Sequence, residues 1–148
     1  MIIIHTIGLP NYFVSFKLSD GSLVNIHILD TSWTEKYKSV NENYYKKADC
    51  ILLVYDITYR QSFDECKFYY NNCIKERCKK NIRVLLVGNK ADLEGNKVVN
   101  PEEGACLALE NDYIFIESSC LKNRNVSDAF EALIEITNIE VKKQWNIL

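Results

Sequence analysis

The chain has 148 residues, of which 47% are hydrophobic and 26% are charged, and its formal net charge at pH 7 is -2. This length is typical of one globular domain, and the near balance of mixed charges argues against a protein drawn to nucleic acid or to an anionic membrane. The six cysteines form no CxxC pair and there are only two histidines. The composition therefore disfavours a zinc site and favours a reduced, cytoplasmic protein.

Neither end of the chain carries a recognisable targeting or anchoring signal. The opening MIII is shorter than the apolar core of a signal peptide, and no apolar run reaches membrane-spanning length. The final KKQWNIL contains no cysteine for prenylation. We therefore expect no lipid anchor.

Two β-prone runs, at residues 11–18 and 23–29, are separated by a turn that contains Asp20 and Gly21. An Asp-Gly pair between such runs is the strongest short-range signal for a β-hairpin. His27 falls on the polar side of the alternation in the second run, so we expect it on a partly exposed face rather than in a metal site.

Residues 31–47 are polar and rich in aromatic side chains, which predicts a loop that leads into a short helix. Residues 50–57 and 82–87 are apolar at almost every position, which predicts parallel strands covered on both sides. Between them, residues 60–79 are predicted to form one helix. Its expected apolar stripe consists of Phe63, Cys66, Phe68, Tyr70, Cys73 and Ile74.

The second half of the chain continues the alternation of helices and strands. A helix is predicted at residues 101–109, a short strand at 113–116 and a terminal helix at 125–143. Strands that alternate with helices predict a single α/β domain over residues 1–148. We expect a mostly parallel sheet with helices on both faces and one antiparallel hairpin strand.

The buried run at residues 82–87 ends at Gly88, and Asn89, Lys90 and Asp92 follow it. Open α/β sheets bind ligands at the carboxyl ends of their strands. There Asp92 can accept two parallel hydrogen bonds from a ring edge, Lys90 can cover the ring and Asn89 can brace the loop. An ordinary turn uses the same residue types, so this segment alone leaves both interpretations open.

Polar residues end two other predicted strands at the same edge of the sheet, namely Asp30 and the segment from Glu117 to Ser119. With these neighbours the chain resembles a small GTPase of the Ras superfamily, closest to the Rab group. The matching segments run in order over nearly the whole chain: Thr6-Ile7-Gly8, Ile28-Leu29-Asp30-Thr31, Tyr44-Tyr45-x-x-Ala48-Asp49, the LLVYDIT from Leu52 to Thr58, the LVGNKADL from Leu86 to Leu93, and Glu117-x-Ser119 followed by Asn125-Val126.

The resemblance implies the P-loop NTPase fold of small G proteins and a GTP/GDP switch of vesicle trafficking. It assigns guanine binding to Asn89, Lys90, Asp92, Ser119 and Cys120. It assigns the Mg²⁺ that accompanies GTP or GDP to Thr6 and Asp30, whose hard oxygen atoms suit this ion.

The chain departs from the family at the phosphate end of the site. The family begins with a strand, a glycine-rich phosphate loop and a helix, whereas this sequence starts after all three and contains no GxxxxGK[ST]. Trp33 stands at the switch glycine, Thr34 at the glutamine that orients the attacking water, and Leu121 at the lysine of Ser-Ala-Lys, with Lys122 beside it. We expect weak phosphate binding, and we assign no catalytic residue.

The strand that is missing relative to the family lies between those at residues 23–29 and 50–57. Residues 1–4 are apolar, but a strand usually has about five residues or more, so we do not expect them to replace it. We expect instead that the sequence lacks an amino-terminal part, or that the two neighbouring strands close up.

Two functions therefore remain open from sequence. The first is a GTP-binding switch with weak or no hydrolysis. The second is a pseudo-GTPase that binds protein effectors or regulators without nucleotide, through the surface around Trp33, Tyr37, Tyr44 and Tyr45. Such an aromatic cluster is more often half-buried core than interface. A nucleic-acid binder would need a basic stripe, which the sequence does not have.

Overall fold

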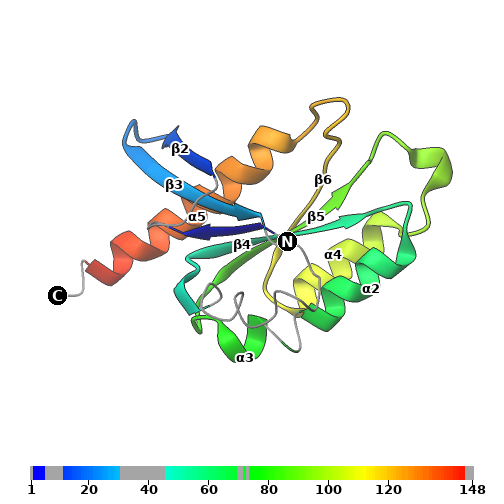
Figure 1. Ribbon diagram of the computed structural model, residues 1–148, viewed down its shortest axis with the longest axis horizontal. Coiled ribbons are helices and arrows are strands. Elements are labelled where there is room, and N and C mark those ends of the chain that lie inside the picture. The colour runs from blue at the N-terminus through cyan, green and yellow to red at the C-terminus, as the bar shows by residue number, and fades with distance from the viewer. Residues whose placement is uncertain (1, 6–11, 31–45, 70–71, 73, 146–148) are drawn as a thin grey trace.

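The computed structural model of the chain describes residues 2–5, 12–30, 46–69, 72 and 74–145. The described strands form one six-stranded sheet in the order β2-β3-β1-β4-β5-β6 (Figure 1). The strands are β1 (Ile2–His5), β2 (Tyr12–Lys17), β3 (Leu23–Asp30), β4 (Cys50–Asp56), β5 (Arg83–Asn89) and β6 (Ile114–Glu117). The helices are α2 (Arg60–Tyr69), α3 (Lys75–Arg77), the 3-10 turn η3 (Glu94–Asn96), α4 (Pro101–Glu110) and α5 (Val126–Trp145).

The predicted hairpin is confirmed as β2 and β3, which pair in antiparallel register from Tyr12 opposite Ile28. Gly21 has a φ of +84°, a backbone conformation that glycine adopts without steric cost. The Asp20 carboxylate accepts the backbone N–H of Ser22 at 2.9 Å, which closes the turn.

Strands β4, β5 and β6 are parallel, and the continuous apolar runs are confirmed as strands buried on both faces. On one face Leu53 and Tyr55 of β4 pack with residues of α2 and α4, including Phe63. On the other face Leu52 packs with α5 through Leu133. Helices thus cover both faces of the sheet, as predicted (Figure 1).

The expectation that residues 1–4 would not fill the centre of the sheet was wrong. Strand β1 lies between β3 and β4 and is antiparallel to both, with Ile2 opposite Asp30 and Leu52. Four residues, Ile2 to Ile4 and His5, suffice because the strand is paired along both edges, which satisfies backbone groups of both neighbours. Two strands of the sheet, β1 and β2, therefore run opposite to the other four, instead of the one strand expected.

The helix predicted at residues 60–79 is described as two helices, α2 and α3, and residues 70, 71 and 73 between them lie outside the described part. Phe63, Cys66 and Ile74 are buried as expected. Phe68 is 51% exposed, so its place in the stripe was wrong. At 100° per residue, Phe68 lies about 140° around the helix from Phe63.

His27 was predicted on a partly exposed face, and the structure contradicts this. Its side chain is 1% exposed, and its ring stacks on that of Phe13 with centroids 4.6 Å apart. Its neighbour Ile26, on the other face of β3, is buried as well, so both faces of the strand are covered at this point. Alternation, which assumes one solvated face, therefore does not apply to this strand.

Candidate functional site

Three parallel strands end side by side and position the loops of the candidate site. Asp56 of β4 lies opposite Asn89 of β5, and Gly88 lies opposite Glu117 of β6. The backbone N–H of Ile57 donates to the carbonyl of Asn89 at 3.1 Å. The loops that follow β5 and β6 are therefore neighbours at one edge of the sheet.

The loop after β5 is braced by Asn89, as predicted from the sequence. Its side-chain oxygen accepts from the Ser118 hydroxyl and from the Cys120 backbone N–H, each at 3.4 Å. The next residue, Lys90, has a φ of +67°, and its carbonyl accepts the N–H of Leu93 at 2.9 Å. A lysine in this left-handed conformation is uncommon and is seen where surroundings hold it.

Asp92 lies against the loop that follows β6. The Ser119 hydroxyl donates to one carboxylate oxygen of Asp92, and this hydrogen bond lowers the pKa of the Asp92 carboxyl. The backbone N–H of Lys122 donates to the Ser119 hydroxyl at 3.1 Å. A carboxylate accepts up to about four hydrogen bonds, so Asp92 retains capacity for a ligand.

Arg124 links the two loops, a role that was not predicted from the sequence. Its guanidinium donates to the carbonyl of Ala91 at 3.0 Å. Its backbone exchanges two hydrogen bonds with Ser119, at 2.9 and 3.0 Å. The Ala91 carbonyl, between Lys90 and Asp92, is thus held by a residue of the loop that follows β6.

Asp56 is a second residue that the sequence did not single out. One of its carboxylate oxygens lies 2.7 Å from the ammonium of Lys90, and the other accepts the N–H and hydroxyl of Thr58 at 2.8 and 2.7 Å. Partial burial raises the pKa of the Asp56 carboxyl, but the hydrogen bonds from Lys90 and Thr58 outweigh burial and lower it. The same ion pair raises the pKa of Lys90.

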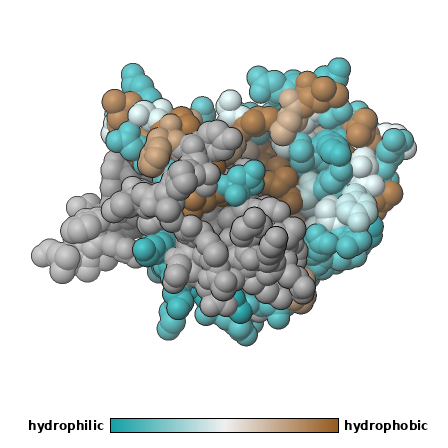
Figure 2. All heavy atoms as spheres, viewed as in Figure 1, coloured by the Kyte–Doolittle hydropathy of each residue, from teal (hydrophilic) through white to brown (hydrophobic). Residues whose placement is uncertain are grey.

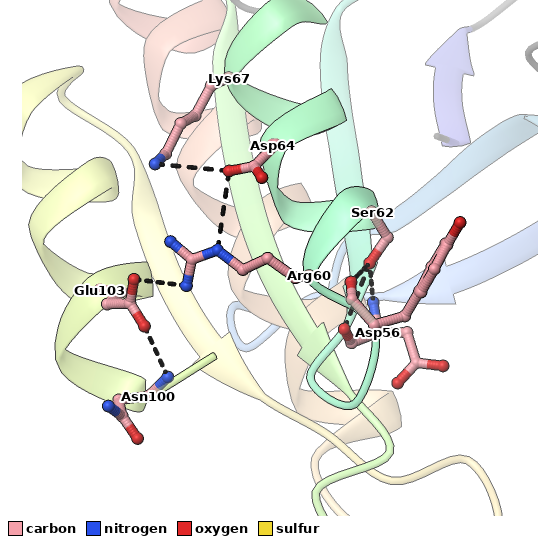
Figure 3. Close-up of polar contacts among 8 residues, drawn as sticks. Asp56, Arg60, Ser62, Asp64, Lys67, Asn100 and Glu103 are labelled. Carbon is pink, nitrogen blue, oxygen red and sulfur yellow. Dashed lines mark hydrogen bonds and ion pairs between the residues drawn. The ribbon is translucent and has the colours of Figure 1, made fainter. Parts of the chain in front are cut away.

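Contacts from α2 support the end of β4 (Figure 3). The Asp56 N–H donates to the Ser62 hydroxyl at 2.9 Å. On the same helix, the Arg60 guanidinium lies 2.6 Å from Glu103, whose carboxylate also accepts the Asn100 N–H at 3.0 Å. Helix α2 therefore connects the site to the amino end of α4.

Apolar side chains are exposed in the same loops, namely Leu93, Val98 and Leu121. Figure 2 shows hydrophobic residues interspersed with hydrophilic ones along the upper edge of the molecule, where these loops lie. The edge thus presents both polar groups and exposed apolar side chains.

The sequence profile of the Ras family matches residues 2–139, nearly the whole chain. The chain belongs to the Ras family. Similar proteins include GTP-binding protein ypt2 of Schizosaccharomyces pombe, 36% identical over 141 residues, which are 95% of this chain and 68% of that protein. Ras-related protein RABA1b of Arabidopsis thaliana is 40% identical over 140 residues, 94% of this chain and 64% of that protein.

Human Ras-related protein Rab-37 is 38% identical over 114 residues, which are 77% of this chain and 51% of that protein. The chain is thus a Rab-like member of the Ras family. Its alignments with these three relatives span 51% to 68% of their own lengths.

The structure brings together the five residues that the Ras resemblance assigns to guanine, and it places Asp30 elsewhere. Asp30 and Leu52 both lie opposite Ile2, so Asp30 is level with Leu52. Leu52 precedes Asp56, at the carboxyl end of β4, by four residues. This offset is about 13 Å along the strand. The remaining predicted residues lie outside the described part: Thr6, Trp33, Thr34, Tyr37, Tyr44 and Tyr45.

Asp30 is the only one of the two predicted Mg²⁺ ligands that the structure describes, and its side chain is exposed. No group of three or more His, Cys, Asp or Glu side chains in the described part is placed to hold a metal ion. Within the same residues, no helix is both long and apolar enough to cross a membrane.

Proposed function

We propose that this Rab-like chain recognises guanine nucleotides through the loops after β5 and β6. The residues that carry the recognition are Asn89, Lys90, Asp92, Ser119 and Cys120. The observation that supports the proposal most directly is the hydrogen bond from Ser119 to Asp92, because it fixes an ionised carboxylate at the ligand edge of the sheet.

The chemistry of guanine suits this arrangement. One edge of the ring carries two neighbouring N–H donors, which a carboxylate such as Asp92 accepts in parallel. The ring carbonyl needs a donor, and the Cys120 N–H can exchange its hydrogen bond to Asn89 for one to the ring, because at 3.4 Å that bond is long and therefore weak. The aliphatic stem of Lys90 supplies apolar surface for the ring face.

The 148 residues given are proposed to bind phosphate weakly and to hydrolyse GTP slowly, because they contain no GxxxxGK[ST] that would supply backbone N–H groups and a lysine to the phosphates. Trp33 and Thr34 replace the glycine and glutamine of the family pattern. By analogy with Rab proteins, we propose that the chain acts in vesicle trafficking in the cytoplasm. Its proposed partners are protein effectors or regulators rather than nucleic acid.

Calorimetric titration of the folded chain with GTP, GDP and ATP, with and without Mg²⁺, tests the proposal. We expect GTP and GDP to release or absorb measurable heat and ATP to give none.

Asp92→Asn should weaken guanine binding about 10- to 100-fold, because hydrogen bonds to a charged acceptor are lost. The matched control is Asp112→Asn, an exposed aspartate before β6. Equal binding of GDP and ATP, or no binding of either, would refute the proposal.

The direction of β1 favours a second candidate, a pseudo-GTPase that binds a protein partner without nucleotide. In the family a central strand leads into the phosphate loop, which requires its carboxyl end to lie at the ligand edge. Here the central strand β1 is antiparallel to β4. This candidate predicts a folded protein that gives no heat with any nucleotide and whose partner binding changes in a Trp33→Gly, Thr34→Gln variant.

A further inference from the structure

We infer that Asp56 is a positioning residue for guanine recognition, which fixes the side chain of Lys90 before a ligand binds. The inference rests on the proposed function, because it assigns a role within the same site. Neither the sequence pattern nor the family resemblance gives Asp56 a part in ligand binding. Its role follows from the contacts at the end of β4.

Asp56 is itself held firmly. Its backbone N–H donates to the Ser62 hydroxyl at 2.9 Å, which ties the end of β4 to helix α2 (Figure 3). One carboxylate oxygen accepts two hydrogen bonds from Thr58, at 2.8 Å from the N–H and 2.7 Å from the hydroxyl. These contacts fix the side-chain rotamer, so the second carboxylate oxygen has a defined position.

That second oxygen lies 2.7 Å from the ammonium of Lys90. The Lys90 side chain is 52% exposed, and an exposed lysine without a partner samples many rotamers. An ion pair with a fixed carboxylate removes most of this freedom in the unliganded protein. A planar ring that packs on the lysine stem then does not have to order it, which increases affinity without a direct contact to Asp56.

The first test compares Asp56→Asn with Asp64→Asn in the full chain. Asp64→Asn removes the same charge as Asp56→Asn. In the wild-type chain Asp64 lies on α2, is 56% exposed, and pairs only loosely with Arg60 and Lys67, at 3.8 Å each. We expect Asp56→Asn to weaken GDP binding about three- to tenfold, the cost of ordering one lysine on binding. Asp64→Asn should leave the dissociation constant unchanged. In NMR titrations without ligand, the pKa of Lys90 should fall only in Asp56→Asn.

A double-mutant cycle shows whether Asp56 acts through Lys90. In a Lys90→Ala background, Asp56→Asn should have no further effect on GDP binding. An equal loss in both backgrounds, or no loss in the wild-type background, would overturn the inference while the proposed function stands. Absence of GDP binding by the wild-type chain would overturn both.

Thr58→Val provides a variant that keeps every charge, should Asp56→Asn fail to fold. It removes the 2.7 Å hydrogen bond from the Thr58 hydroxyl and loosens the Asp56 rotamer. A smaller loss of GDP affinity is expected, and this loss should also disappear in the Lys90→Ala background. Unchanged affinity in Thr58→Val, with Asp56→Asn unfolded, would count against the inference.

Discussion

The hydroxyl of Tyr55 is a buried polar group for which the described residues supply no hydrogen-bond partner. The side chain is 2% exposed and fits between β5 and α4, where Gly88 and Gly104 leave room for it. A buried hydroxyl without a partner costs about 1–3 kcal/mol in free energy of folding. This residue therefore lowers the stability of the core that supports the site.

Tyr55→Phe should raise the free energy of unfolding by about 1 kcal/mol, because it removes the unsatisfied hydroxyl and keeps the ring. Urea denaturation measures the change. Tyr59→Phe is the matched control, since its exposed hydroxyl donates to Gln61 and should contribute little. If Tyr55→Phe instead lowered the free energy of unfolding by more than about 1 kcal/mol, the hydroxyl would have a hydrogen-bond partner after all.

Ser119→Ala should raise the pKa of the Asp92 carboxyl towards its usual value, because the hydroxyl that lowers it is removed. A lowered pKa keeps the Asp92 carboxylate charged to lower pH. Its contribution to guanine binding is therefore lost only as the pH falls through that lowered pKa. Guanine binding should consequently be lost at a higher pH in the variant. Carboxyl ¹³C NMR measures the pKa of Asp92 in both proteins. An unchanged Asp92 would show that Ser119 does not set its pKa.

Among the elements, α4 packs unusually closely on the sheet at Gly104. A Cβ built there would lie 2.5 Å from the ring of Phe115 and 2.6 Å from the Tyr55 hydroxyl. Gly104→Ala should therefore lower the free energy of unfolding by about 1 kcal/mol or more, although alanine favours a helix by about that amount. Gly95→Ala, whose Cβ meets no atom within 4 Å, should change it by less than about 0.5 kcal/mol. Equal effects in thermal or urea unfolding would contradict the close packing.

Strand β1 is the element on which the continuity of the sheet depends. Because it pairs with β3 and β4, the amides of Ile3 and Ile4 should exchange with solvent as slowly as those of β4. Deletion of residues 1–5 should leave unpaired backbone groups that cost about 1–3 kcal/mol each when buried, enough to unfold a domain of ordinary stability. Fast exchange at Ile3 and Ile4 in the intact chain would show that the slot is not filled in this way.

For the whole molecule, the sequence was sufficient to predict the elements whose signals are local. The Asp20-Gly21 turn and the apolar runs of β4 and β5 predicted their strands correctly, and Asn89 was confirmed as the brace of its loop. Whether the loop binds guanine stays a prediction.

The features that sequence did not predict depend on contacts between distant segments. An apolar run has no intrinsic direction, so the antiparallel placement of β1 was not accessible from its four residues. The contacts of Asp56 with Lys90 and of Arg124 with Ala91 require strands that are far apart in the chain to end side by side. The burial of His27 depends in part on Phe13 of the neighbouring strand β2, whose ring stacks on the imidazole.

The most direct test of the central claim is a ¹H–¹⁵N NMR titration of the folded chain with GDP, with ADP as the control. The account predicts chemical-shift changes that concentrate on the amides of Lys90, Ala91, Asp92, Ser119 and Cys120, and no comparable changes with ADP. Changes of equal size with both nucleotides, or none at these amides, would contradict guanine recognition by the loops after β5 and β6.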